Sequence, residues 1–311
     1  MTVELPMLVV FCSSGLDPTE VEPDFASEHA AATASGYTTV LVDHDELVSG
    51  SASRGVSDVG RWQPAKAALY RGWMLPVARY EAFYRALEAR GISLINTPSA
   101  YRACHLLPET YPIIEPLTPE TAWIPLDELM QEGRVDWARV AETAARFGAA
   151  AVIVKDYVKS QKHQWGEACY IPRANDTDAV RRVVERFLEL QGDDLAGGLV
   201  IRRYVRLRQL GVHAQSGMPL GEEYRLFIAD GQPIITAPYW DADGRGAELP
   251  TADLVAIARQ VPSRFFSMDV ARGDDGRWWI IELGDGQVAG LPPGINPARF
   301  YQAISERWGK P

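Results

Sequence analysis

The sequence predicts two regions of different architecture: a small α/β domain with a parallel sheet, followed by an α+β region with a mostly antiparallel sheet. Short apolar runs alternate with segments of helical composition through about residue 100, which is typical of parallel α/β units. Two later pairs of apolar runs, at 223–236 and 265–285, are each joined by a tight turn containing Asp-Gly, which is typical of hairpins. At 311 residues the chain exceeds one average domain.

In the first region, four apolar runs predict strands, at 8–11, 38–42, 67–72 and 92–96. An alanine-rich segment at 25–35 and a segment at 80–90 with apolar side chains at helical spacing predict helices. Each of these helical segments ends before a glycine, Gly36 or Gly91, as helices commonly do.

Between residues 100 and 130, five prolines predict an irregular linker that crosses to the second region. Beyond it the pattern predicts helices at 136–147 and 177–190 and strands at 150–158 and 199–205. A lysine, Lys155, interrupts the first of these apolar strands.

The composition, 47% hydrophobic and 23% charged, is that of a globular protein, and no apolar run approaches the length of a membrane span. The first residues lack the basic flank of a secretory signal, and three widely spaced cysteines fit a reducing compartment. A net charge of −10 disfavours a general nucleic-acid binder. We therefore expect a cytoplasmic protein with neither a membrane nor a nucleic acid as partner. No pattern predicts an oligomeric state.

The hairpin at 265–285 carries one acidic residue in each apolar strand, Asp269 and Glu282. An ionised carboxylate within a sheet is costly unless a cation or hydrogen-bond donors meet it. Two carboxylates on adjacent strands suit Mg²⁺, which takes one or two protein carboxylates and fills its other positions with substrate phosphates. The hairpin therefore predicts either a metal site in a nucleotide-dependent centre or a carboxylate that reaches solvent at a strand end.

Four features follow one another in the chain: the strand lysine Lys155, a strand with a basic linker at 201–208, a Glu-Tyr-Arg hairpin at 223–235, and the acidic hairpin. This order resembles the ATP-grasp superfamily. The resemblance covers roughly residues 95–295, and the ending IELGDGQVAGL at 281–291 is most similar to an uncharacterised bacterial and phage branch.

The resemblance implies an ATP-grasp fold of two α+β lobes with a mostly antiparallel sheet, preceded by a small α/β domain. We expect the N-terminal domain at 1–105 and the ATP-grasp domain at 106–311. Its lobes would span 106–198, with Lys155 and a lid loop, and 199–311, with the metal carboxylates.

The resemblance assigns Lys155 to the phosphates of ATP, for which an ammonium group is a good partner. Lys159 would share its face if the strand continued with a period of two, and would then bind phosphate and assist catalysis. Residues 159–166 lie where the family carries a mobile lid. Other interpretations remain: Lys155 can extend to solvent at a strand end, and the basic run with Lys162 and His163 can be a solvated turn.

Ile201, Arg203, Tyr204 and Val205 lie where the family's hinge strand contacts adenine, although ordinary strand core is an equal interpretation. Many members carry an acidic residue here for the ribose, whereas this chain has arginines.

Glu223 and Arg225 alternate with Tyr224 and should share one face of their strand. The resemblance places Glu223 at the nucleotide and gives Arg225 a catalytic role at the transferred phosphoryl group, where a guanidinium binds oxygens bidentately. A structural ion pair is the alternative.

Asp269 and Glu282 match the family's metal carboxylates. The third ligand is commonly an asparagine two residues after the glutamate; here that position is Gly284, so Asp285 becomes the candidate. Many members also carry a phosphate-binding lysine before the linker. This chain has Tyr101–His105 there, with Arg102 as a candidate replacement.

The implied ligands are ATP and Mg²⁺, and the implied substrates are a small-molecule or peptide carboxylate and an amine acceptor. The implied activity is amide or peptide-bond formation through an acyl phosphate, with an acceptor pocket built by the N-terminal domain and the segments 211–222 and 239–249. Two alternatives share the same ATP site: a phosphotransferase, and a nucleotide-binding module with reduced catalysis.

Overall fold

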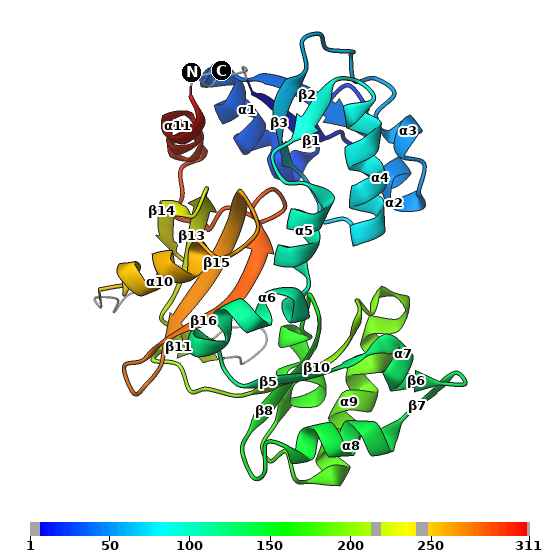
Figure 1. The fold of residues 1–311 in the computed structure, drawn as a ribbon, viewed down its shortest axis with the longest axis vertical. Helices are drawn as coiled ribbons and strands as arrows, with labels where there is room; N and C mark the ends of the chain where they lie inside the picture. Colours follow the sequence, from blue (N-terminus) through cyan, green and yellow to red (C-terminus); the bar gives the residue numbers. More distant parts are fainter. Residues whose placement is uncertain (1–6, 213–218, 241–247, 310–311) are drawn as a thin grey trace.

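The structure is a computed structural model and describes residues 7–212, 219–240 and 248–309. The described residues form three four-stranded sheets and two small hairpins (Figure 1). None of the helices in this part of the chain is long and apolar enough to cross a membrane.

The N-terminal sheet is parallel and has the strand order β2-β1-β3-β4. Its strands are β1 (Leu8–Cys12), β2 (Thr38–Val42), β3 (Lys66–Arg71) and β4 (Ile92–Leu94), and its helices are α1 (Ala26–Ala34), α2 (His44–Ser49), α3 (Ala52–Gly55) and α4 (Val77–Glu88). Alternate residues of β1 enter different cores: Val10 packs with α4, and Val9 with α1. Burial of both faces explains the continuous apolar runs and confirms the predicted parallel sheet.

The predicted linker between residues 100 and 130 is wrong, because this segment is largely regular. It contains α5 (Pro98–His105), α6 (Leu107–Ile114), β5 (Thr121–Pro125) and α7 (Leu126–Leu129). Pro98 and Pro108 lie in the first turns of α5 and α6, where a backbone N–H has no partner within the helix. These prolines therefore start helices instead of preventing them.

The middle sheet has the order β5-β10-β8-β9 and is antiparallel. It contains β8 (Val152–Asp156), β9 (Tyr170–Ile171) and β10 (Gly198–Arg203), and the helices α8 (Trp137–Ala145) and α9 (Thr177–Gln191) share its hydrophobic core. Asp136 and Asp176 cap the two helices by accepting a bond from a backbone N–H. A small hairpin of β6 (Met130–Gln131) and β7 (Arg134–Val135) precedes α8.

The third sheet is antiparallel, with the order β14-β13-β15-β16. Its strands are β13 (Glu223–Ala229), β14 (Gln232–Pro238), β15 (Phe265–Arg272) and β16 (Trp278–Asp285), and a separate hairpin pairs β11 (Gln209–Val212) with β12 (Pro219–Gly221). Helix α10 (Thr251–Ala258) packs on one face. Helix α11 (Pro297–Trp308) lies between this sheet and the N-terminal sheet, so that Phe300 shares one core with Phe11 and Phe227 (Figure 1).

A buried ion pair links these parts. Arg71, only 1% exposed at the end of β3, donates from Nε and Nη2 to both carboxylate oxygens of Glu28 on α1, at 2.8 and 2.9 Å. Its Nη1 donates to the Gly286 carbonyl at 2.6 Å, and its guanidinium lies over the Phe300 ring. One side chain therefore joins α1, α11 and the turn after β16.

We predict that Arg71→Met lowers the free energy of unfolding by about 3–5 kcal/mol, because it leaves the Glu28 carboxylate buried without its partner. Urea denaturation measures the change. The matched control is Arg54→Met, which removes an exposed pair with Glu46 and should cost at most about 1 kcal/mol. Equal losses in the two variants would contradict a structural role for the buried pair.

Candidate active site

A β-bulge sets the position of the two hairpin carboxylates. On β15 and β16, Val270 pairs with Ile280 but Asp269 pairs with Glu282, so Ile281 is the extra residue. Without the bulge, Ile281 would oppose Asp269. The bulge therefore places Asp269 and Glu282 directly opposite each other on one face of the sheet.

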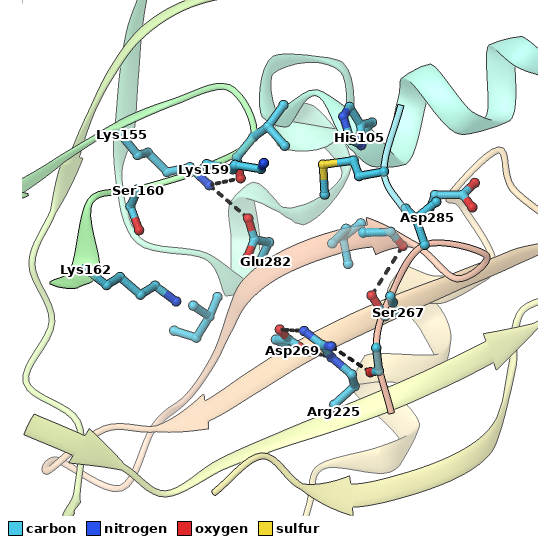
Figure 2. Close-up of a pocket in the computed structure, with 18 of the residues that line it drawn as sticks. His105, Lys155, Lys159, Ser160, Lys162, Arg225, Ser267, Asp269, Glu282 and Asp285 are labelled. Atoms are coloured by element: carbon cyan, nitrogen blue, oxygen red, sulfur yellow. Dashed lines mark hydrogen bonds and ion pairs between the residues drawn. The ribbon is translucent and has the colours of Figure 1, made fainter. Parts of the chain in front are cut away.

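Each carboxylate is bonded to a different cation. Arg225 lies opposite Asp269 on β13 and donates from Nε and Nη2 to its two oxygens, both at 2.7 Å. Lys155, on β8 of the middle sheet, donates from Nζ to Glu282 Oε1 at 3.0 Å (Figure 2). The second pair therefore joins the two antiparallel sheets.

These pairs determine the protonation of the site. Burial acts to raise the pKa of Glu282, but the charges of Lys155 and Lys162 outweigh it and lower the pKa to about 2. Burial acts to lower the pKa of Arg225, but its hydrogen bonds to Asp269 outweigh burial and raise it. Glu282 and Arg225 are therefore both ionised at neutral pH.

A cavity of about 370 Å³ opens in front of the carboxylates. Its polar lining includes His105, Lys155, Lys159, Ser160, Lys162, Arg225, Ser267, Asp269 and Glu282. Lys162 points from the segment after β8 toward the carboxylates (Figure 2). Burial acts to lower its pKa, but the charges of Glu282 and Glu223 raise it overall.

Lys159 lines the cavity for a different reason from the one predicted. Strand β8 ends at Asp156, so alternation along the strand does not extend to Lys159. Instead the chain turns back, and the backbone N–H of Asp156 donates to the Lys159 carbonyl at 2.9 Å. The following residues form short helical turns at Lys162–Gln164 and Trp165–Cys169.

A second cavity, of about 110 Å³, adjoins the first. Both are lined by Ile153, Lys162, Arg202 and Ile281, so they are contiguous. Mostly apolar and aromatic side chains line its far end, including Trp165, Tyr204, Val205, Leu207 and Leu220. The arrangement can hold a flat apolar group beside a cluster of cations.

Glu223 lies at the border of the second cavity and accepts a hydrogen bond from Trp240 Nε1 at 2.7 Å. Burial raises its pKa. Parts of the expected acceptor segments, residues 213–218 and 241–247, lie outside the described residues.

Two of the residues expected at the hinge turn their side chains away. Ile201 is fully buried in the core with α8 and α9, and neither cavity includes it. Arg203 lines the second cavity, but its guanidinium bonds to Glu120 at 2.6 and 2.9 Å and lies over Phe147. Tyr204 and Val205 are the hinge residues that the structure brings to the apolar cavity without such a diversion.

Asp285 is not brought together with Asp269 and Glu282. It pairs with Phe266 across the sheet, and Phe266 packs into the core on the opposite face. Its carboxylate accepts from Asn96 Nδ2 at 2.6 Å and from the Gln287 backbone N–H at 2.9 Å, and burial raises its pKa to about 6. In the described part of the chain, no three His, Cys, Asp or Glu side chains gather to hold a metal ion.

His105 is a cavity residue that no sequence pattern indicated. Its ring stacks on Tyr101, with centroids 4.8 Å apart, and burial lowers its pKa to about 4. Tyr101 lies four residues earlier on α5, a spacing that places the two rings on one helix face. Arg102, the expected substitute for the missing lysine, instead bonds to Glu109 at 2.9 Å on the surface.

A family model described as an ATP-grasp domain, the third family of its clade, matches residues 146–304. None of the curated proteins that were compared matches the chain. Among solved structures, the ATP-grasp ligase PsnB complexed with minimal precursor, Mg and ADP is 15% identical with a TM-score of 0.55, covering 96% of this chain and 98% of that one.

Two further solved structures have a similar fold. D-cycloserine synthetase DcsG is 16% identical with a TM-score of 0.59, covering 97% of this chain and 99% of that one. D-alanine–D-alanine ligase from Bacillus anthracis complexed with ATP is 15% identical with a TM-score of 0.58, covering 98% and 96%. At these identities the likeness shows a shared fold.

We predict that His105 makes the protein less stable in mild acid. Its pKa is near 6.5 when unfolded and about 4 when folded, so its contribution is present above pH 6.5 and is lost as pH falls toward 4. Between pH 7 and 4.5 the wild type should lose about 2 kcal/mol more than His105→Gln in urea unfolding. Parallel pH dependences would contradict the buried, neutral imidazole.

Proposed function

This chain belongs to the ATP-grasp domain family whose model it matches, and we propose that it is an ADP-forming ligase that joins a carboxylate to an amine through an acyl phosphate. One observation carries the proposal. Asp269 and Glu282 lie opposite each other, each bonded to a cation, in the wall of a cavity that continues into an apolar pocket.

The charges around the cavity fit a polyphosphate. Lys155, Lys159 and Lys162 come from one segment, and Arg225 comes from the facing sheet. An incoming triphosphate would bind these cations in place of the protein carboxylates, with the base in the apolar cavity near Tyr204 and Val205. The segment at 159–166 would then close over the phosphates.

The donor set also fits Mg²⁺. Asp269 and Glu282 offer carboxylate oxygens from one face of the sheet, and such hard ligands are the ones that Mg²⁺ takes. The ion would neutralise charge on the phosphates. Asp285 is left out of this proposal, because its carboxylate is bonded to Asn96.

In the proposed reaction, a substrate carboxylate oxygen forms a bond to the γ-phosphorus, and the bond from that phosphorus to the β-phosphate oxygen breaks, which releases ADP. The amine nitrogen then forms a bond to the acyl carbon, phosphate leaves, and the nitrogen loses a proton. The protein contributes position and charge, and the planar guanidinium of Arg225 can bind two oxygens of the transferred group.

We predict that Asp269→Asn and Glu282→Gln each lower ATP turnover by at least about 100-fold, because both keep the shape but remove a charge that is required at the phosphates. ADP and phosphate release would be measured with a panel of amino acids and peptides, and the products identified by mass spectrometry. Glu128→Gln, which changes an exposed pair with Arg139, is the control.

Near-normal turnover in either carboxylate variant would contradict the proposed site. A stable phosphorylated product without free phosphate would identify a phosphotransferase. Tight binding of Mg-ATP without turnover of any acid and amine would identify a nucleotide-binding module.

We predict that Lys155→Ala weakens ATP binding by about 1.5–3 kcal/mol, the contribution expected for a hydrogen bond to a charged group. Isothermal titration calorimetry measures the affinity. Lys66→Ala, on β3 of the N-terminal sheet, is the control for loss of a lysine elsewhere. An unchanged affinity in Lys155→Ala would remove this residue from the nucleotide site.

A further inference from the structure

Arg202 is a buried arginine at the point where the two antiparallel sheets meet. It follows Ile201 on β10, and its side chain is 4% exposed. Its Nη1 donates to the carbonyl of Ile281 at 2.5 Å, and its Nη2 donates to Thr118 Oγ1. Thr118 in turn donates from Oγ1 to the carbonyl of Ile280 at 2.7 Å.

These bonds reach the β-bulge itself. Ile281 is the extra residue that brings Glu282 opposite Asp269, and a bulge locally disrupts the ladder of backbone bonds. Arg202 and Thr118 together supply donors to the carbonyls of Ile281 and Ile280. The pair therefore stabilises the irregular part of β16 immediately before Glu282.

Arg202 also contacts the ligand cavities. It lines both of them at their junction, together with Lys162, whereas neither cavity includes Thr118. Its Nε is buried and has no hydrogen-bond partner among the described residues. A buried donor without a partner is costly, so this geometry favours a ligand group at the junction. Burial lowers the pKa of Arg202 to about 10, and the side chain remains charged at neutral pH.

We propose that Arg202, supported by Thr118, is a positioning residue that holds the Ile281 bulge and so keeps Glu282 opposite Asp269. The meaning for catalysis rests on the proposed ligase function. The position of the carboxylates, in contrast, can be measured without turnover, by the binding of a divalent cation.

The test compares Thr118→Val, Thr118→Ser and Arg202→Lys with the wild type. Mn²⁺ binding in the presence of ADP is measured by electron paramagnetic resonance, and ADP binding without metal by calorimetry. Because Thr118 lines neither cavity, Thr118→Val should weaken Mn²⁺ about tenfold, as loss of an outer partner does, and leave metal-free ADP affinity within about twofold.

Thr118→Ser keeps the hydroxyl and should restore wild-type Mn²⁺ affinity, which a general packing defect would not do. The double variant Arg202→Lys with Thr118→Val should lose less than the sum of the single losses, because the two residues act on the same bulge. Thr143→Val, at a buried threonine hydroxyl on α8, and Arg139→Lys on the surface are the controls.

The inference is overturned if Thr118→Val and Arg202→Lys bind Mn²⁺ within about twofold of the wild type, or if the wild type binds no Mn²⁺ with ADP. If the metal losses occur but no acid and amine are joined, the positioning role stands and the ligase proposal fails. If Arg202→Lys does not fold by circular dichroism, the contrast between Thr118→Val and Thr118→Ser decides.

Discussion

The structure of the site depends on two carboxylates that face each other across β15 and β16. Asp269 and Glu282 repel at this separation, and burial adds a desolvation cost to each charge. Both costs are offset by cations from different places. Arg225 comes from the neighbouring strand, and Lys155 comes from the other antiparallel sheet. The electrostatics of the site thus require the two sheets to stay together.

In the absence of ligand, the bonded cations and carboxylates balance one another. A polyphosphate with a divalent cation can replace both kinds of partner at once, because the phosphates take Lys155 and Arg225 while the metal takes the carboxylates. Such an exchange leaves no buried charge unpaired. Binding only the metal or only the phosphates would leave one set without partners, which is strongly unfavourable in a buried site. The arrangement therefore favours joint binding of nucleotide and metal.

Periodicity predicted the strands and hairpins of both regions, because buried faces leave a clear pattern in the sequence. The failures have local physical causes. Pro98 and Pro108 begin helices that their composition did not indicate. The single-residue bulge at Ile281 has no sequence signal, yet it decides which side chain opposes Asp269. His105 was missed because its role depends on stacking against Tyr101 and on burial, which only the packed structure provides.

Asp285 shows how the N-terminal domain contributes to the cavity. Its carboxylate accepts from Asn96 on the N-terminal side, and Gln287 joins the same network by donating from Nε2 to the Tyr80 hydroxyl at 2.7 Å. Arg71 holds the Gly286 carbonyl next to it. These bonds fix the turn after β16, and the residues that follow, 288–290, line the main cavity. A buried network of this kind tolerates few geometries, because each unpaired member is costly. The carboxylate that the sequence proposed as a metal ligand therefore anchors the N-terminal domain to the wall of the site.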